Sequence, residues 1–210
     1  CLVSWARKMC IRDRAADDAV FTADVGSPTV WAARYLSMTE NRRLIGSFTH
    51  GSMANALLHG IGAQVSHPDR QVIALAGDGG LAMMLGELLT LTQNKLPVKT
   101  IVVNNSSLNF VELEMKAAGF VNYGTALDNP SFAAIAEAMG IFARRVENSE
   151  DLPDAVREVL AHDGPALLDV VTERQELSMP PAIEAAQVKG FALYAIRTVC
   201  LLYTSPSPRD

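Results

Sequence analysis

The chain has 210 residues and a net charge of −5, with 18 Lys and Arg against 23 Asp and Glu. This acidic balance argues against a protein that binds nucleic acid through backbone phosphates. No apolar run reaches the roughly 18 residues of a membrane-spanning helix. The three cysteines, Cys1, Cys10 and Cys200, lie near the ends. The interior therefore offers no disulfide or thiolate metal site, and we expect a reducing, cytoplasmic location.

The two ends resemble translated DNA adapters. Residues 9–13 (MCIRD) can be encoded by a DNA segment whose opposite strand encodes Leu-Leu-Tyr-Thr, the sequence found at 201–204. We therefore expect residues 1–14 and 200–210 to be non-native, to make few core contacts and not to continue the fold. The remaining segment, 15–199, carries 13 Lys and Arg against 21 Asp and Glu, a net charge of −8. It is long enough for one globular domain.

Between the ends, short apolar strands alternate with longer helical patterns. Near-continuous apolar strands are typical of a sheet buried on both faces, so the alternation predicts an α/β fold with an open, mostly parallel sheet and helices on both faces. In chain order we expect strand 20–25, a helix opening at Ser27, strand 43–48, helix 53–65, strand 71–76, helix 81–92, strand 98–103, helices 108–118 and 131–139, strand 142–146, helix 152–161, strand 166–171, a break at Met179-Pro180-Pro181, and helix 183–197.

Polar side chains directly follow two of the expected strands. Gly77-Asp78-Gly79-Gly80 follows strand 71–76, and Asn104-Asn105 follows strand 98–103. The carboxyl ends of parallel strands meet at one edge of the sheet, where ligands bind. Glycines permit close approach to an anion and unusual dihedral angles, and the helix expected from Leu81 would direct free amides to the same place. A carboxylate beside an amide oxygen suits Mg²⁺, so these residues predict a metal–diphosphate site.

Two other interpretations of the glycine-rich segment compete with this one. Residues 77–82 also satisfy the dinucleotide-binding pattern G-x-G-x-x-A. That pattern requires an acidic residue at the end of the next strand, where Asn104-Asn105 stands, and Asp78 would repel a bare pyrophosphate. A tight strand–helix turn without a ligand would explain the glycines, but not the polar pair that follows the next strand.

Gly-Asp-Gly at 77–79 and Asn-Asn at 104–105 together resemble the signature of the thiamine-diphosphate enzymes, and the resemblance runs over about residues 21–197. Within that superfamily the chain looks most similar to the quinone-reducing pyruvate oxidases (pyruvate:quinone oxidoreductases). The stretches that carry this narrower resemblance are 28–35 (PTVWAARY), 46–56 (GSFTHGSMANA), 95–99 (KLPVK) and 114–116 (EMK). Ser107 and Asn109 depart from the pattern.

The resemblance implies a role for each matching residue. Asp78 and Asn105 would bind Mg²⁺ through side-chain oxygens, and Ser107 through its backbone carbonyl. Met53 would be an apolar wedge that bends the cofactor, although an ordinary core methionine is the alternative. Phe110 and Glu114 would be catalytic and face the substrate, although a solvated helix face would also explain Glu112 and Glu114. The cofactor-binding set that the resemblance implies is Gly51, Ser52, Met53, Asp78, Gly79, Gly80, Asn105, Ser106, Ser107, Leu108, Asn109 and Phe110.

The resemblance also implies a larger enzyme. In the resembled enzymes, thiamine diphosphate decarboxylates pyruvate, and FAD on a middle domain passes two electrons to a membrane quinone with release of acetate. A glutamate on a further domain activates the cofactor, and the site forms between subunits. We therefore expect this chain alone to be an inactive part of a homotetramer that associates peripherally with the inner membrane.

Two other activities remain open. An acetolactate synthase-like carboligase or a 2-oxoacid decarboxylase would share this domain. A non-catalytic regulatory homologue would be expected to have lost its metal ligands, whereas Asp78 and Asn105 are both present.

Overall fold

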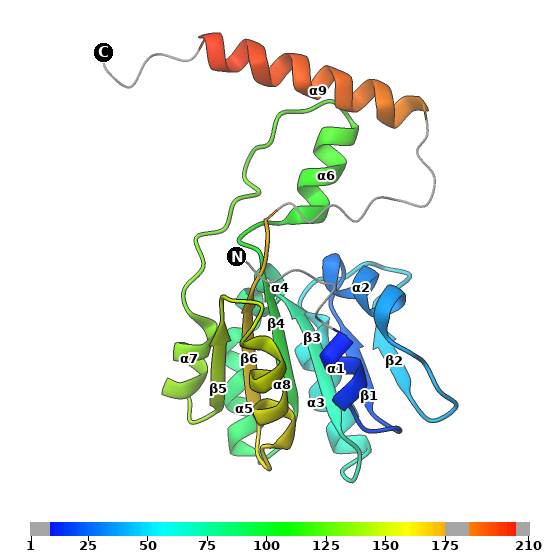
Figure 1. Cartoon of the computed structure of the whole chain (residues 1–210), viewed down its shortest axis with the longest axis vertical. Coiled ribbons are helices and arrows are strands. Elements are labelled where there is room, and N and C mark those ends of the chain that lie inside the picture. The colour runs from blue at the N-terminus through cyan, green and yellow to red at the C-terminus, as the bar shows by residue number, and fades with distance from the viewer. Residues whose placement is uncertain (1–8, 175–184, 205–210) are drawn as a thin grey trace.

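Six parallel strands form one sheet in the computed structural model, which describes residues 9–174 and 185–204. The strand order is β2-β1-β3-β4-β6-β5 (Figure 1). This confirms the α/β fold with an open parallel sheet that the sequence predicted. The strands are β1 (Val20–Ala23), β2 (Arg43–Gly46), β3 (Val72–Gly77), β4 (Lys99–Asn104), β5 (Phe142–Val146) and β6 (Ala166–Val171). The helices are α1 (Met9–Arg14), α2 (Ser27–Tyr35), α3 (Asn55–Ser66), α4 (Asp78–Met83), α5 (Leu88–Gln93), α6 (Asn109–Ala117), α7 (Phe132–Ala138), α8 (Leu152–Ala161) and α9 (Ala185–Thr204).

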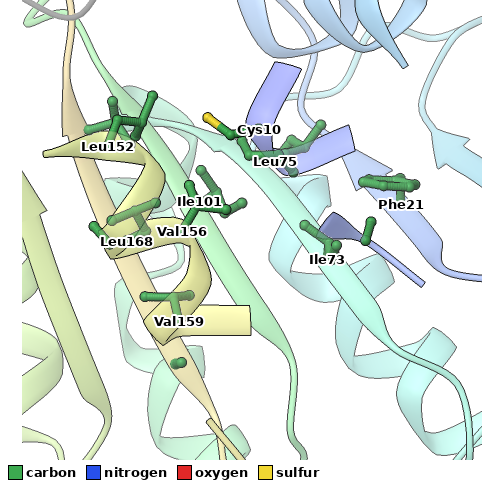
Figure 2. Packing of buried hydrophobic residues seen from close by; sticks show 14 of the residues in the cluster. Cys10, Phe21, Ile73, Leu75, Ile101, Leu152, Val156, Val159 and Leu168 are labelled. Atoms are coloured by element: carbon green, nitrogen blue, oxygen red, sulfur yellow. The ribbon is translucent and has the colours of Figure 1, made fainter. Parts of the chain in front are cut away.

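The core has two layers because alternate residues of each strand point to opposite faces of the sheet. On one face, Phe21, Ile73, Ile101 and Leu168 pack with residues of α1 and α8 (Figure 2). On the other face, strand residues pack against α3, α4, α5 and α7; the strand residues of this second cluster are Val20, Val72, Ala74, Ala76, Val102, Ala143 and Leu167. Both faces of the sheet are therefore covered, which explains why most residues of its central strands are apolar and buried.

The amino-terminal end contributes to the first of these layers. Cys10 and Ile11 in α1 are buried among the core residues, and α1 contacts α8 (Figure 2). The expectation that residues before Ala15 make few core contacts is therefore wrong for these two. At the other end, Cys200 and Leu201 are exposed on α9, which continues past residue 199 to Thr204. Residues 1–8 and 205–210 lie outside the described part of the chain, and the non-native origin of the ends stays a prediction.

One expected helix is divided in the structure. The helix expected over 81–92 is divided into α4, a 3₁₀ turn at Leu85–Glu87, and α5. Helix α4 begins at Asp78, directly after β3, so the glycine-rich segment is helical. The last helix, α9, runs beyond the sheet and packs on α6 (Figure 1). Gly190 makes this packing close, since an added Cβ would overlap the carbonyl oxygen of Ala117.

None of the helices in the described residues combines the length and the hydropathy needed to cross a bilayer, α9 included.

The sheet order creates a switch point beside β1. From β1 the chain passes through α2 on one face to β2, and then returns through α3 on the opposite face to β3. Strands β1 and β3 are paired in parallel, with Ala23 opposite Leu75. Where consecutive connections leave a parallel sheet on opposite faces, a crevice opens beyond the carboxyl ends of the strands. A ligand site is therefore expected among the residues that follow β1, β3 and their neighbour β4.

Lys99 is the first residue of β4, at the end of the strand away from this crevice. Its contacts make a contribution to stability that depends on pH. Its ammonium group is buried and donates to the backbone carbonyls of His162 and Gly164. Burial lowers the pKa of Lys99 to about 8, against 10.5 for an ordinary lysine. Between pH 8 and pH 10 the unfolded chain therefore binds more protons at this group than the folded chain does, so its contribution to stability rises with pH.

We predict that the free energy of unfolding of the unaltered chain, relative to Lys99→Met, rises by on the order of 1 to 3 kcal/mol between pH 8 and pH 10. Urea unfolding of both proteins across that range measures the difference. A difference that stays constant, or that falls with pH, would show that burial does not depress the pKa of Lys99.

Candidate functional site

A cavity of about 250 Å³ lies beyond the carboxyl ends of β1, β3 and β4. It is lined by three segments that follow these strands, by residues from the turn before α3, and by one face of α6. The lining residues are Asp24, Val25, Gly26, Ser27, Pro28, Gly51, Met53, Gly77, Asp78, Gly79, Gly80, Val103, Asn105, Ser107, Leu108, Asn109, Phe110, Val111 and Glu114. The cavity therefore lies at the switch point of the sheet.

Asp78 and Asn105 meet in this cavity because β3 and β4 are neighbours. Gly77 pairs with Val103, so the residues that follow emerge side by side. The carboxylate Oδ2 of Asp78 accepts the backbone amides of Asn105 at 3.1 Å and of Ser106 at 2.7 Å. The predicted juxtaposition of the two motifs at adjacent strand ends is thus observed. Ser106 has a positive φ of 54°, which is a sparsely populated conformation for a residue other than glycine. The hydrogen bonds from the amides of Asn105 and Ser106 to Asp78 help to hold this backbone conformation.

The oxygen atoms of the pair fit a hard divalent cation. Within residues 9–174 and 185–204, Asp78 Oδ1 accepts one hydrogen bond, from the amide of Gly79 at 2.8 Å, and Asn105 Oδ1 accepts one, from the amide of Ser107 at 3.1 Å. Each oxygen has about two acceptor positions, so each keeps one for a further partner. Both residues are almost fully buried and line the cavity. One carboxylate oxygen and one amide oxygen with free acceptor positions are a donor set that suits Mg²⁺.

Burial makes the site unfavourable for an uncompensated charge. Desolvation raises the pKa of Asp78 above the ordinary carboxyl value, although four hydrogen bonds, including those of Gly79 and Ser106, oppose the shift. Burial raises the pKa of Asp24 in the same way, against the amides that it accepts. Two carboxylates in one cavity are costly to hold ionised, and a bound cation would offset that cost.

Asp24 is a residue of the cavity that the sequence analysis missed. Its Oδ1 accepts the amide of Ala56 at 2.8 Å and its Oδ2 accepts the amide of Gly77 at 3.0 Å. One side chain thereby ties the end of β1 to the start of α3 and to the end of β3. A signal was present, since Asp24 directly follows an apolar strand and precedes Gly26, as Asp78 follows another.

The glycines after Asp78 serve close packing in this structure. A Cβ at Gly80 would lie 2.3 Å from Asp24 Oδ2, and one at Gly79 would lie 2.8 Å from Leu108 Cδ2. Neither glycine is among the described residues with positive φ. The expectation of unusual dihedral angles is therefore wrong for both, because the segment is already helical.

A second residue that the sequence analysis missed comes from a distant loop. Asn129 Nδ2 donates to Asp78 Oδ2 at 2.8 Å and to Asn104 Oδ1 at 3.0 Å. Nothing in the sequence around Asn129 marks it, because it follows neither a strand nor a glycine-rich turn and reaches the site only through the folded loop before α7.

Most of the predicted site residues line the same cavity. Met53 contributes from the turn before α3, 3.5 Å from a Cβ at Gly79, and Phe110 and Glu114 lie on the α6 side. Ser52 and Ser106 are not among the lining residues: Ser52 donates its amide to Ser47 Oγ, and Ser106 donates its amide to Asp78. What each residue binds stays a prediction.

Glu112 belongs to the interior and not to a solvated helix face. It is 2% exposed and accepts bonds from Ser107 Oγ at 2.9 Å, Lys116 Nζ at 2.7 Å and Asn122 Nδ2 at 2.9 Å. Burial alone would raise the pKa of Glu112, but the bonds from Lys116 and Ser107 outweigh it and hold the pKa below the ordinary value. This buried charge fixes α6 to the loop that carries Asn105 and Ser107.

The packing around Gly80 yields a stability prediction. Gly80→Ala would drive a methyl group into Asp24, so we expect a loss of about 1 to 3 kcal/mol in the free energy of unfolding. The control is Gly62→Ala in α3, where nothing lies within 4 Å of the added Cβ and the change should stabilise the helix by about 0.5 to 1 kcal/mol. Chemical denaturation compares the three proteins, and equal stability of both variants would contradict the close contact with Asp24.

Comparison with known proteins is consistent with this geometry. The sequence profile of the family described as "Thiamine pyrophosphate enzyme, C-terminal TPP binding domain" matches residues 24–170. The Bacillus subtilis protein YdaP, whose name refers to thiamine pyrophosphate, is 38% identical over 187 residues, which cover 89% of this chain and 32% of that protein.

Two acetolactate synthases are similar over nearly the same region. The large subunit from Porphyra purpurea is 34% identical over 186 residues, covering 86% of this chain and 31% of that protein. The isozyme 2 large subunit from Escherichia coli is 33% identical over 172 residues, covering 81% and 31%. The chain thus spans about a third of the length of these curated relatives. None of the three is named as a pyruvate oxidase, so the narrower resemblance noted in the sequence receives no support from them.

Proposed function

This chain belongs to the thiamine pyrophosphate enzymes through their C-terminal TPP-binding domain, and we propose that its cavity binds the diphosphate of thiamine diphosphate through Mg²⁺. The observation that carries this proposal is the pair of buried oxygens, Asp78 Oδ1 and Asn105 Oδ1, each with a free acceptor position at the same cavity. The cation would be held by these two side chains and by the backbone carbonyl of Ser107.

The remaining lining residues would receive the rest of the cofactor. Thiamine diphosphate, when bound, supplies the nucleophilic carbon and the electron sink for decarboxylation of a 2-oxo acid. Gly79 and Gly80 bring the backbone of α4 to the cavity, and Met53, whose Cε lies 3.5 Å from a Cβ at Gly79, offers an apolar contact beside them. Gly51 would offer a backbone edge. Phe110 and Glu114 would face the substrate. Pyruvate is the proposed substrate, and a second copy of the full-length protein would complete the site.

Acetolactate synthase-like carboligation is the activity that the comparisons favour. Relatives with that name match at 33 to 34% identity over most of this chain. In this reaction two pyruvate molecules give one acetolactate and one carbon dioxide, so no electron acceptor is needed.

Oxidation of pyruvate is the second candidate, and the local stretches at 28–35, 46–56, 95–99 and 114–116 favour it. Here pyruvate, water and an oxidised acceptor give acetate, carbon dioxide and the reduced acceptor, with FAD and a quinone as carriers in the full-length protein. Product analysis of the full-length protein, with and without a quinone analogue, separates the two. Acetolactate formed without an acceptor supports carboligation, whereas acetate formed only with the acceptor supports oxidation.

Asp78→Asn tests the proposed cofactor site directly. The carboxamide would turn its oxygen toward the amides of Asn105 and Ser106 and its NH₂ group toward the cavity, where it cannot bind a cation. We predict at least a tenfold loss of Mg²⁺-dependent affinity for thiamine diphosphate, measured by isothermal titration calorimetry, with the circular dichroism spectrum unchanged. The charge-matched control is Asp154→Asn, at an exposed position of α8, and this variant should bind as the unaltered protein does. Equal affinity in the Asp78 and Asp154 variants would refute the metal assignment.

A further inference from the structure

Asn129, from the loop before α7, donates a hydrogen bond to the same carboxylate oxygen of Asp78 that accepts the amides of the loop after β4. Its Nδ2 donates to Asp78 Oδ2 at 2.8 Å and to Asn104 Oδ1 at 3.0 Å. The other donors to Asp78 are the backbone amides of Gly79, Asn105 and Ser106. These amides belong to the same short segments as the proposed metal ligands. Among the described residues, Asn129 is thus the donor that reaches Asp78 from a separate part of the chain.

A series of hydrogen bonds that begins at the carboxylate of Asp169 determines that Asn129 donates to its neighbours through its NH₂ group. Asp169 is fully buried, and both of its carboxylate oxygens accept hydrogen bonds. Its Oδ1 accepts from Asn104 Nδ2 at 3.0 Å. This orients the Asn104 amide with its oxygen toward Asn129, which must then present its NH₂ group. The same NH₂ group donates to Asp78, a second carboxylate.

Asp169, at the other end of this series of hydrogen bonds, is itself held in place. Asp169 Oδ2 accepts from Arg145 Nη1 at 2.6 Å and from the amide of Phe132 at 3.1 Å. Phe132 is the first residue of α7, and Asn129 lies three residues before it. The arginine on β5 and the start of α7 therefore hold in place the loop that carries Asn129.

The two carboxylate oxygens of Asp78 accept different numbers of hydrogen bonds from the described residues. Oδ2 accepts three donors, from Asn105, Ser106 and Asn129, whereas Oδ1 accepts one, from Gly79. A carboxylate oxygen has about two acceptor positions. Oδ2 is therefore saturated, and Oδ1 alone can bind a cation.

We propose that Asn129 is a positioning residue that restricts Asp78 to binding a cation through one oxygen and thereby favours Mg²⁺ over Ca²⁺. This inference rests on the proposed metal–diphosphate site. Mg²⁺ requires near-octahedral geometry with single-oxygen ligands at 2.0–2.1 Å, whereas Ca²⁺ accepts six to eight oxygens and often takes both oxygens of a carboxylate. A carboxylate locked with one oxygen turned away suits the smaller ion.

Asn129→Leu tests the proposal, because leucine has nearly the shape of asparagine and no donor. The two remaining donors to Oδ2 both come from the loop of Asn105 and can shift with it, so Asp78 becomes free to turn. Affinity for thiamine diphosphate is measured by isothermal titration calorimetry in MgCl₂ and in CaCl₂, with the full-length protein that carries this domain. Loss of a partner of a metal ligand typically lowers metal affinity by about 10- to 100-fold. We expect that loss in Mg²⁺ and a clearly smaller one in Ca²⁺, so that the ratio of the two affinities shifts toward Ca²⁺.

The matched control is Ser131→Ala, which removes the N-cap of α7, where Ser131 Oγ accepts the amide of Ala134. This change loosens the same segment without removing a donor to Asp78, and it should leave the ratio of the two affinities unchanged. Asn129→Ala provides a second variant in case the leucine does not fold, and it should shift the ratio in the same direction.

Three results would overturn the proposal, and they are distinguishable. Equal losses with both cations in Asn129→Leu or Asn129→Ala would mean that Asn129 has only a structural role. The same shift in Ser131→Ala would assign the effect to the loop. Failure of the full-length protein with the unaltered domain to bind thiamine diphosphate with either cation would remove the proposed function, and this inference with it.

Discussion

The carboxylate of Asp78 is the contact on which the geometry of the cavity depends. It accepts two backbone amides from the loop after β4, one from its own helix α4, and one side chain from the loop before α7. Four hydrogen bonds offset the cost of burying this group, and no single one of them would do so. Because the donors come from three segments, the position of Asn105 beside Asp78 follows from these bonds as well as from strand pairing.

Asp24 has the corresponding role on the other side of the cavity. It joins the end of β1 to the start of α3 and to Gly77, and its Oδ2 is the atom that leaves no room for a side chain at Gly80. Two buried carboxylates thus surround one small volume, each held by backbone amides and each with a raised pKa. A bound cation would offset the cost of these two charges, which is the physical link between this fold and the proposed binding of a metal–diphosphate group.

The sequence predicted those parts of the fold and site that follow from local pattern. Apolar runs located every strand, and polar residues directly after 71–76 and 98–103 located the pair Asp78 and Asn105. Contacts between distant segments escaped prediction. Asn129 lies 51 positions from Asp78 in the sequence and still donates to it. The sequence pattern allowed a solvated helix face for Glu112, but Ser107, Lys116 and Asn122 donate hydrogen bonds to its buried carboxylate. The helix boundary at Asp78 was also missed, because glycines argue against helix unless packing requires them.

The most direct test of the account is to locate the cation itself. Crystals of the protein grown with thiamine diphosphate and Mn²⁺, which binds the same oxygen ligands as Mg²⁺, would reveal the ion by its anomalous scattering. The account predicts a peak bonded to Asp78 Oδ1 and Asn105 Oδ1, with the diphosphate on its other side and Asp78 Oδ2 still bonded to Asn129. A peak elsewhere in the molecule, or a diphosphate bound in this cavity without an ion, would contradict it.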